Sequence, residues 1–178
     1  IFAGSQPARV RRLVLLEGLA PLAESPEGAP ARLERALQAE ARHRGRAEQT
    51  PVYPDLDSVV ERLQKVQSSM SEASARVLLG RGLQPRGDGV TWRSDRRLRH
   101  PSRIRLTEDQ ILAFLRTIRA PTLLVRANNG IPFAAELAQA RAGAVDDLRV
   151  VEVEGGHHVH LDAPERVAPY VAEHLDAS

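Results

Sequence analysis

The sequence predicts an α/β fold, in which helices pack against a sheet of parallel strands. Three short apolar runs have the length and composition of buried strands, at residues 13–16, 122–125 and 148–153. Helical patterns separate these runs, and strands that alternate with helices form parallel sheets. Ligands of such sheets gather beyond the carboxyl ends of the strands, and Glu17 and His157 are expected at two of those ends.

The first predicted strand, residues 13–16, follows a segment that resembles the tail of a helix interrupted at Pro7. Because the strand is wholly apolar, we expect it to be buried on both faces. It ends at Glu17-Gly18, and residues 1–23 form the first core segment.

Residues 24–106 have a different pattern and predict a helical insertion, or cap. Prolines separate amphipathic stretches there, and no run typical of a parallel strand occurs. The pattern predicts three helices, followed by a loop-rich segment with a short extended piece. The helices are expected at residues 31–44, 58–68 and 71–80, and the extended piece at 90–92.

The α/β pattern returns in residues 107–178, which form the carboxyl-terminal core. Thr107 is well placed to cap a helix that continues to residue 118. The strand at 122–125 is followed by a polar Asn128-Asn129-Gly130 turn. Further helices are expected at 133–141 and 164–175, on either side of the strand at 148–153.

Composition excludes several classes of protein. The 178 residues contain no cysteine, which rules out disulfides, thiol catalysis and cysteine-ligated metals. The 25 basic residues nearly balance the 23 acidic ones, and aromatic residues make up 3%, so we expect no nucleic-acid partner. No membrane span or secretory signal is apparent, and no cofactor is predicted. We therefore expect a soluble protein, cytoplasmic by default.

His157 is the first candidate for chemistry, because it follows a strand and the glycine pair Gly155-Gly156. Glycines allow the backbone to turn closely, and an imidazole takes and returns protons near neutral pH. A zinc site formed with His158 and His160 is the weaker reading, because no other histidine is near in sequence and no His-x-x-x-His pair exists. A histidine that only satisfies loop backbone groups is a further alternative.

Glu17 is the second candidate, at the end of an apolar strand. A carboxylate there is costly to desolvate unless it is paired, so it either turns into solvent or meets a cation or imidazolium. From the sequence alone, an ordinary loop acid is the favoured reading.

A nucleophile is not apparent. The chain contains no Gly-x-Ser-x-Gly motif, and Ser58, Ser68, Ser69 and Ser94 do not fit a strand-to-helix turn flanked by glycines. The chain also begins at Ile1, without methionine, inside an apolar stretch, which predicts that it is part of a longer polypeptide.

Taken in order, these segments resemble the carboxyl-terminal part of an α/β-hydrolase of the serine hydrolase-like group. The resemblance rests on an Arg-Leu-x-Leu-Leu-acid strand at 12–17, a Leu-Leu-x-Arg-Gly stretch at 78–82, and the Gly-x-His-x-x-His segment at 155–160. An Asp-Ala-Pro sequence at 162–164 and a final helix complete it.

The resemblance implies a fold, an activity on a small ester or acyl substrate, and roles for individual residues. His157 aligns with the family's catalytic base. The common acid position after the strand at 122–125 holds only Asn128 and Asn129, which carry no charge, so the acid falls to Glu17, as in certain haloalkane dehalogenases.

The same resemblance implies that the nucleophile lies just upstream of Ile1, in a missing amino-terminal half of the same fold. It also implies that Trp92, from the cap, and His160 contribute to substrate binding, although Trp92 is equally explained as a core aromatic of the cap. Two alternatives stay open: a haloalkane dehalogenase or epoxide hydrolase with an Asp nucleophile, and a non-catalytic ligand-binding or interaction protein of the same fold.

Overall fold

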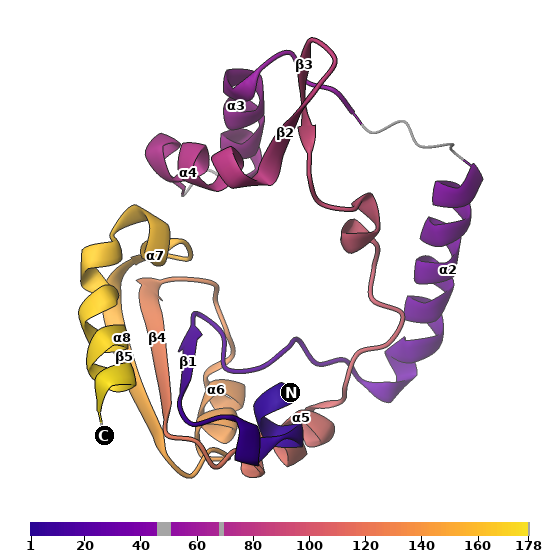
Figure 1. Cartoon of the computed structure of the whole chain (residues 1–178). Helices are drawn as coiled ribbons and strands as arrows, with labels where there is room; N and C mark the ends of the chain where they lie inside the picture. Colours follow the sequence, from indigo (N-terminus) through magenta and orange to yellow (C-terminus); the bar gives the residue numbers. More distant parts are fainter. Residues whose placement is uncertain (46–50, 68–69, 178) are drawn as a thin grey trace. The chain divides into compact units, whose positions relative to one another are not determined.

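The computed structural model describes residues 1–45, 51–67 and 70–177, and the chain divides into two compact units. The first unit combines residues 1–25 with the chain from Leu106 onward, and the second unit is Pro26–Arg105. Figure 1 shows the elements of both units in sequence colours. Within the described residues, no helix combines the length and apolar character needed to cross a bilayer.

A parallel sheet forms the centre of the first unit, as predicted. Its strands are β1 (Leu13–Leu16), β4 (Thr122–Asn129) and β5 (Leu148–Gly156), in the order β1-β4-β5 (Figure 1). The expectation that β1 is buried on both faces is wrong for the described residues. This strand lies at the edge of the sheet and pairs only with β4, so its residues are half-buried and Leu16 is exposed.

Helices cover the sheet through two apolar clusters. On one face, α7 (Val159–Asp162) and α8 (Ala168–Asp176) pack over alternate residues of β4. Buried members of this cluster are Leu123, Val125, Ala127, Val153, Val159 and Val167. The second cluster joins α1 (Phe2–Ser5), α5 (Glu108–Arg116) and the chain that follows α6 (Ala135–Ala142). Its buried members are Ala3, Ile111, Leu115, Ile118, Ala144 and Val145.

Several predicted boundaries in the first unit differ from the structure. Strand β4 continues to Asn129 and β5 continues to Gly156, because pairing between the two strands persists beyond their apolar residues. The predicted helix at 164–175 begins only at Ala168, after α7 and a short 3₁₀ turn at Pro164–Arg166. Thr107 caps α5 as predicted: its hydroxyl accepts the Gln110 N–H, and the Gln110 side-chain oxygen accepts the Thr107 N–H.

The second unit contains α2 (Ala29–Gly45), α3 (Leu56–Val66) and α4 (Glu72–Gly82), followed by the hairpin strands β2 (Leu83–Arg86) and β3 (Gly89–Trp92). Sequence analysis predicted β3 but missed β2, which contains Pro85 and pairs through a turn at Gly87. The predicted stop of the third helix at Gly80 is also wrong, since α4 ends at Gly82. Ser68 and Ser69, at the predicted end of the second helix, lie outside the described residues.

Candidate active site

Glu17 stands directly after β1 in a backbone conformation that is unusual for a residue with a side chain. Its φ is 66°, in the left-handed region, where a Cβ atom costs about 1 kcal/mol. Its N–H donates to the Val125 carbonyl across a distance of 2.8 Å, so the sheet ladder fixes this conformation. Strain of this kind persists where the surrounding structure enforces it, and it is frequent at functional sites.

The Glu17 carboxylate is almost completely buried, with 6% of the side chain exposed, and both of its oxygens have partners. One oxygen, Oε1, accepts the backbone N–H of Ala127, near the end of β4. The other, Oε2, lies 3.2 Å from Nδ1 of His157. The structure therefore brings together the two side chains that the sequence singled out, across 140 residues of chain.

His157 is held at the end of β5 by the turn that precedes it. Gly155 has a φ of 154°, and a Cβ atom there would lie 2.6 Å from Val159, so this turn requires glycine. The Gly155 N–H donates to Oδ1 of Asn128 at 3.1 Å, which ties the turn to the neighbouring strand. Asn128, which cannot serve as the acid because it carries no charge, thus has a structural link to the histidine loop.

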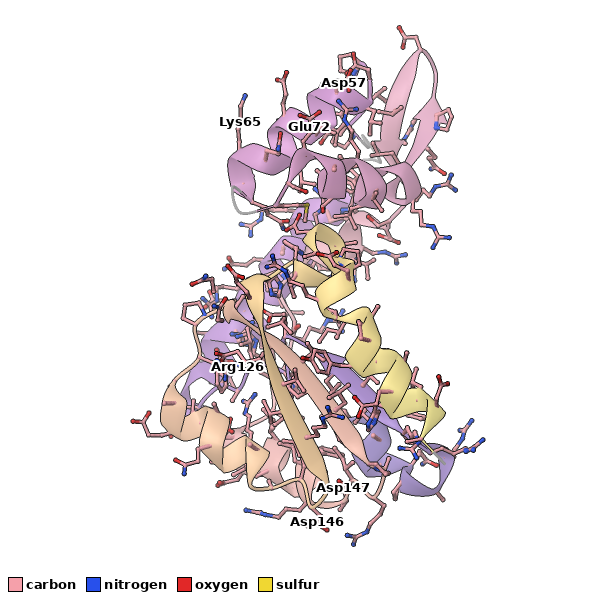
Figure 2. The ribbon with its side chains drawn as sticks, turned by 90° about the vertical axis from the view of Figure 1, so that its left-hand side faces the viewer. Asp57, Lys65, Glu72, Arg126, Asp146 and Asp147 are labelled. Atoms are coloured by element: carbon pink, nitrogen blue, oxygen red, sulfur yellow. The ribbon has the colours of Figure 1, made fainter. Side chains whose placement is uncertain are left out.

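A cavity of about 490 Å³ opens beside this pair, and both Glu17 and His157 line it. Most of the wall is apolar, with Leu19, Leu22, Ile131 and Phe133 among its side chains. Arg126, which is labelled in Figure 2, contributes a polar part from β4. Its Nε lies 3.6 Å from Oε2 of Glu152 on β5. The cavity, with few polar groups converging on it, has the character of a small-molecule site.

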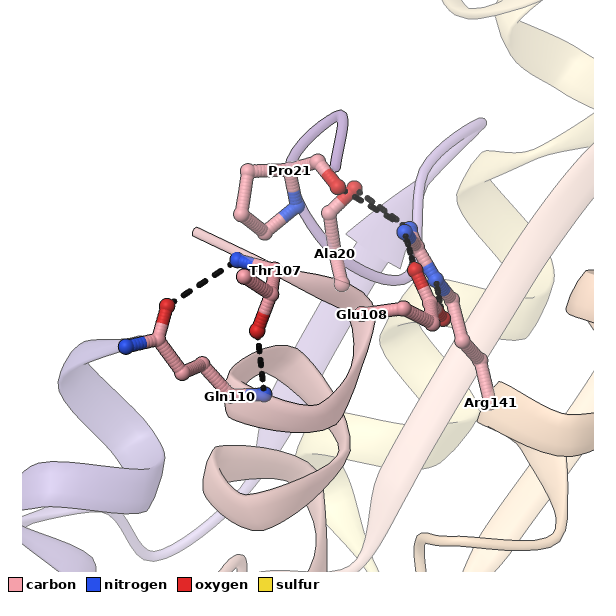
Figure 3. A network of polar contacts seen from close by, with 6 residues as sticks. All are labelled: Ala20, Pro21, Thr107, Glu108, Gln110 and Arg141. Carbon is pink, nitrogen blue, oxygen red and sulfur yellow. Dashed lines mark hydrogen bonds and ion pairs between the residues drawn. The ribbon is translucent and has the colours of Figure 1, made fainter. Parts of the chain in front are cut away.

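Arg141 of α6 fixes the segment that follows Glu17. Its guanidinium, 3% exposed, forms a two-point ion pair with Glu108 at 2.8 and 2.7 Å. The same group donates to the carbonyls of Ala20 and Pro21 at 3.3 and 3.0 Å (Figure 3). The hydrogen bond from Arg141 lowers the pKa of Glu108 below its usual value. A buried, fully bonded guanidinium is rigid, so it holds this wall of the cavity in place.

Two further histidines follow His157. His158 lies with its ring centre 4.8 Å from that of His157, and burial, reinforced by the charges of His157 and His160, lowers the His158 pKa. His160 is exposed on α7 and does not line the cavity. In the ranges that the structure describes, no three His, Asp or Glu side chains converge in a way that could hold a metal ion.

Trp92, the other residue predicted to bind substrate, lies at the end of β3 in the second unit. Arg99 stacks over its indole with Cζ 5.3 Å from the ring centre, and a Cβ atom built on Gly82 would lie 3.3 Å from the ring. Its predicted role in binding stays a prediction. Sequence reasoning missed Arg141 and Gly130 as residues that shape the site, because nothing in their local sequence distinguishes a buried arginine or a spatially required glycine.

A carboxylate at this distance from Nδ1 can fix the tautomer of an imidazole. With the Nδ1 proton donated to Glu17, the lone pair of His157 is on Nε2, where it can accept a proton from a hydroxyl group.

Comparison with known proteins adds independent evidence. A probable serine hydrolase of Drosophila melanogaster is 30% identical over 188 aligned residues, which cover 98% of this chain and 55% of that protein. The crystal structure of a hypothetical protein of Pseudomonas aeruginosa PAO1 superposes with a TM-score of 0.83 and 35% identity, over 97% of this chain and 60% of that chain. A thioesterase domain from the curacin biosynthetic pathway superposes with a TM-score of 0.76 and 27% identity, over 97% and 61% of the two chains. No family model matches the sequence.

The parallel sheet, its flanking helices and these structural neighbours define the chain as a member of the α/β-hydrolase superfamily. Within the superfamily, it is similar to a probable serine hydrolase of Drosophila melanogaster and to a serine hydrolase-like protein of Danio rerio. The chain spans about half the length of the fly protein that it matches.

Proposed function

We propose that this chain provides the general base and the orienting acid of a serine hydrolase that acts on a small ester or another acyl compound. The observation that carries the proposal is the 3.2 Å contact between Oε2 of Glu17 and Nδ1 of His157 at the edge of an apolar cavity. The serine hydrolase and thioesterase names of the similar proteins support acyl chemistry.

In the proposed mechanism, Nε2 of His157 removes the proton of a serine hydroxyl as the serine attacks the acyl carbon. Glu17 keeps the Nδ1 proton and stabilises the imidazolium, which then protonates the leaving group. Water hydrolyses the resulting acyl-enzyme with His157 again acting as the base. Backbone amides outside this chain would hold the oxyanion.

The nucleophile, in this proposal, belongs to a part of the protein outside these 178 residues. The sequence has no Gly-x-Ser-x-Gly motif, and Ser5 and Ser25, the described serines of the first unit, do not line the cavity. The partner of this chain is therefore the amino-terminal half of the same fold. The apolar edge strand β1, with Leu16 exposed, is suited to pairing with a strand of that half.

Trp92 and His160 complete the proposal as substrate-binding residues, with residues 24–106 as the cap. Replacement of Trp92 or of His160 is expected to raise KM more than it lowers kcat, as for residues that bind ground state and transition state alike. An unchanged KM in both variants would show that neither residue binds substrate.

We also propose that the protein is located in the cytoplasm, which cell fractionation tests.

A fluorophosphonate probe tests the function on the intact protein. We expect stoichiometric labelling of one serine outside residues 1–178, located by mass spectrometry of the labelled peptide, and loss of labelling in His157→Ala. A His157→Ala variant that labels and hydrolyses esters at the parental rate contradicts the proposal.

A second candidate function follows from the place of Glu17 after β1, because certain haloalkane dehalogenases take their acid from that position. In such an enzyme the nucleophile is an aspartate, as it would be in an epoxide hydrolase. The aspartate would not react with the fluorophosphonate and would instead form an alkyl-ester adduct with a haloalkane or epoxide substrate. A protein that forms neither adduct is the non-catalytic alternative.

A further inference from the structure

Gly130 lies against the Glu17 carboxylate, immediately after the end of β4. A Cβ atom built on Gly130 would stand 2.2 Å from Oε2 of Glu17 and 3.0 Å from the carboxylate carbon. Oε2 is the atom that contacts Nδ1 of His157. The space that a side chain at position 130 would need is thus already filled by the oxygen that holds the histidine.

The need for glycine at position 130 is one of space and not of backbone conformation. The glycines with positive φ are Gly87 and Gly155, and Gly130 is not among them. Its N–H donates to the Ala127 carbonyl at 3.2 Å, an ordinary turn that other residues form. The turn reading of the Asn128-Asn129-Gly130 sequence therefore does not explain this glycine.

We infer that Gly130 is a positioning residue, which acts by leaving room for the Glu17 carboxylate to reach His157 from the end of β1. The inference rests on the proposed function and adds a residue to it. The Glu17 carboxylate can lie here because the residue directly after β4 has no side chain.

The stability and the activity of a Gly130→Ala variant should respond differently. The atoms in the way are at the far end of a glutamate side chain, which can move more easily than backbone. To restore an ordinary contact of 3.4 Å, the carboxylate must shift by about 1 Å, and misplacement on that scale costs about 10²-fold in rate. The variant should therefore fold with a Tm near that of the parent and lose about 10²-fold in kcat, with KM unchanged.

Gly4→Ala is the matched control in the same unit. A Cβ at Gly4 would lie 2.3 Å from the backbone oxygen of Phe114, a similarly close approach to atoms that cannot move independently. We expect this variant to lower the Tm while each folded molecule keeps the parental kcat. Gly143→Ala, whose Cβ would lie 3.4 Å from the Gln139 oxygen, should change neither quantity.

A double-mutant measurement separates positioning from a general loss of structure. In a Glu17→Ala background, Gly130→Ala should have no further effect on kcat, because the group through which it acts is gone.

Three results would each overturn the inference. Gly130→Ala could keep the parental kcat, it could fail to fold, or it could lose as much kcat in the Glu17→Ala background as in the parent. Glu17→Gln, measured in parallel, distinguishes this failure from that of the proposed function. Unchanged kcat in Glu17→Gln removes the acid role itself, whereas a loss there together with an active Gly130→Ala removes only the positioning role.

Discussion

Two sets of charged side chains, one from each unit of the chain, differ in how far they are buried. In the first unit, Arg141 and Glu17 have 3% and 6% of their side chains exposed, and each has several fixed partners. In the second unit, Arg76 bridges Asp57 on α3 and Glu72 on α4, and these side chains are 43%, 69% and 58% exposed. Figure 2 labels the two acidic residues on their helices. Exposed pairs are screened by water and contribute little, whereas a buried charge that loses its partner is expensive. Loss of a charge at the cavity should therefore cost more stability than loss of a charge in the exposed network of Arg76.

The histidines of the two units show the same difference. His157 faces a buried carboxylate, whereas His43 and His100 of the second unit contact each other edge to face, with ring centres 5.1 Å apart. Of these two contacts, only that between His157 and Glu17 can hold a proton on one particular ring nitrogen.

The largest expected effect is on activity. His157→Ala should reduce kcat for ester hydrolysis by about 10⁴-fold, because the base is lost. His43→Ala is the control from the second unit and should keep the parental kcat. Steady-state assays with a chromogenic ester measure both variants, and similar rates for the two would show that the contrast has no functional meaning.

The next effect is on stability. Arg141→Met should destabilise the protein by about 3–5 kcal/mol, because it leaves Glu108 and two backbone carbonyls without their buried partner. Arg76→Met, in the second unit, should leave the denaturation midpoint almost unchanged. Urea denaturation monitored by circular dichroism compares them, and equal midpoints would contradict the assignment of a structural role to Arg141.

A smaller effect concerns the backbone of Glu17. Because its φ is 66°, Glu17→Gly should be more stable than Glu17→Ala by about 1 kcal/mol, although both variants lack the acid. At Glu61, on helix α3, the order should reverse, since glycine is the poorer helix former. Differences between the Gly and Ala denaturation curves at each position give the result. An Ala variant at position 17 as stable as the Gly variant would argue against strain.

The smallest effect is a pH dependence. The hydrogen bond from Arg141 lowers the pKa of Glu108 in the folded state, so the unfolded chain binds more protons as the pH falls below the normal glutamate pKa. This contribution to stability is complete above the unfolded pKa and is lost as the pH falls through the lowered folded pKa. Arg141→Met should flatten this part of the stability profile, measured by urea midpoints from about pH 6 to about pH 3. If the urea midpoint of the variant depended on pH as strongly as that of the parent, the pH dependence would arise from other carboxylates.

Much of the fold could be predicted because local sequence determines it. The apolar runs of β1, β4 and β5 gave the sheet, and Thr107 and Ser71 marked the starts of α5 and α4. The ends of elements were harder. Asn128-Asn129 and Gly155-Gly156 have turn composition, yet pairing between β4 and β5 continues into both segments, with Asn129 opposite Gly156.

The two polar side chains of the candidate site could be predicted, but the residues that hold them in place could not. His157 and Glu17 were singled out from their places after strands, but only the resemblance to α/β-hydrolases favoured Glu17 as the acid over an ordinary loop residue. The left-handed backbone of Glu17, the space kept by Gly130 and the buried pair of Arg141 with Glu108 depend on residues far apart in the chain. No local pattern encodes such contacts, because they arise only when the elements pack.

The central claim, that the carboxylate of Glu17 serves the imidazole of His157, is tested most directly by the kcat of Glu17→Gln in the intact protein. Glutamine keeps the size of the side chain but removes its charge, so the claim predicts a loss of about 10²–10⁴-fold in kcat at a nearly parental Tm. A folded Glu17→Gln protein that hydrolyses its substrate at the parental rate would contradict the claim.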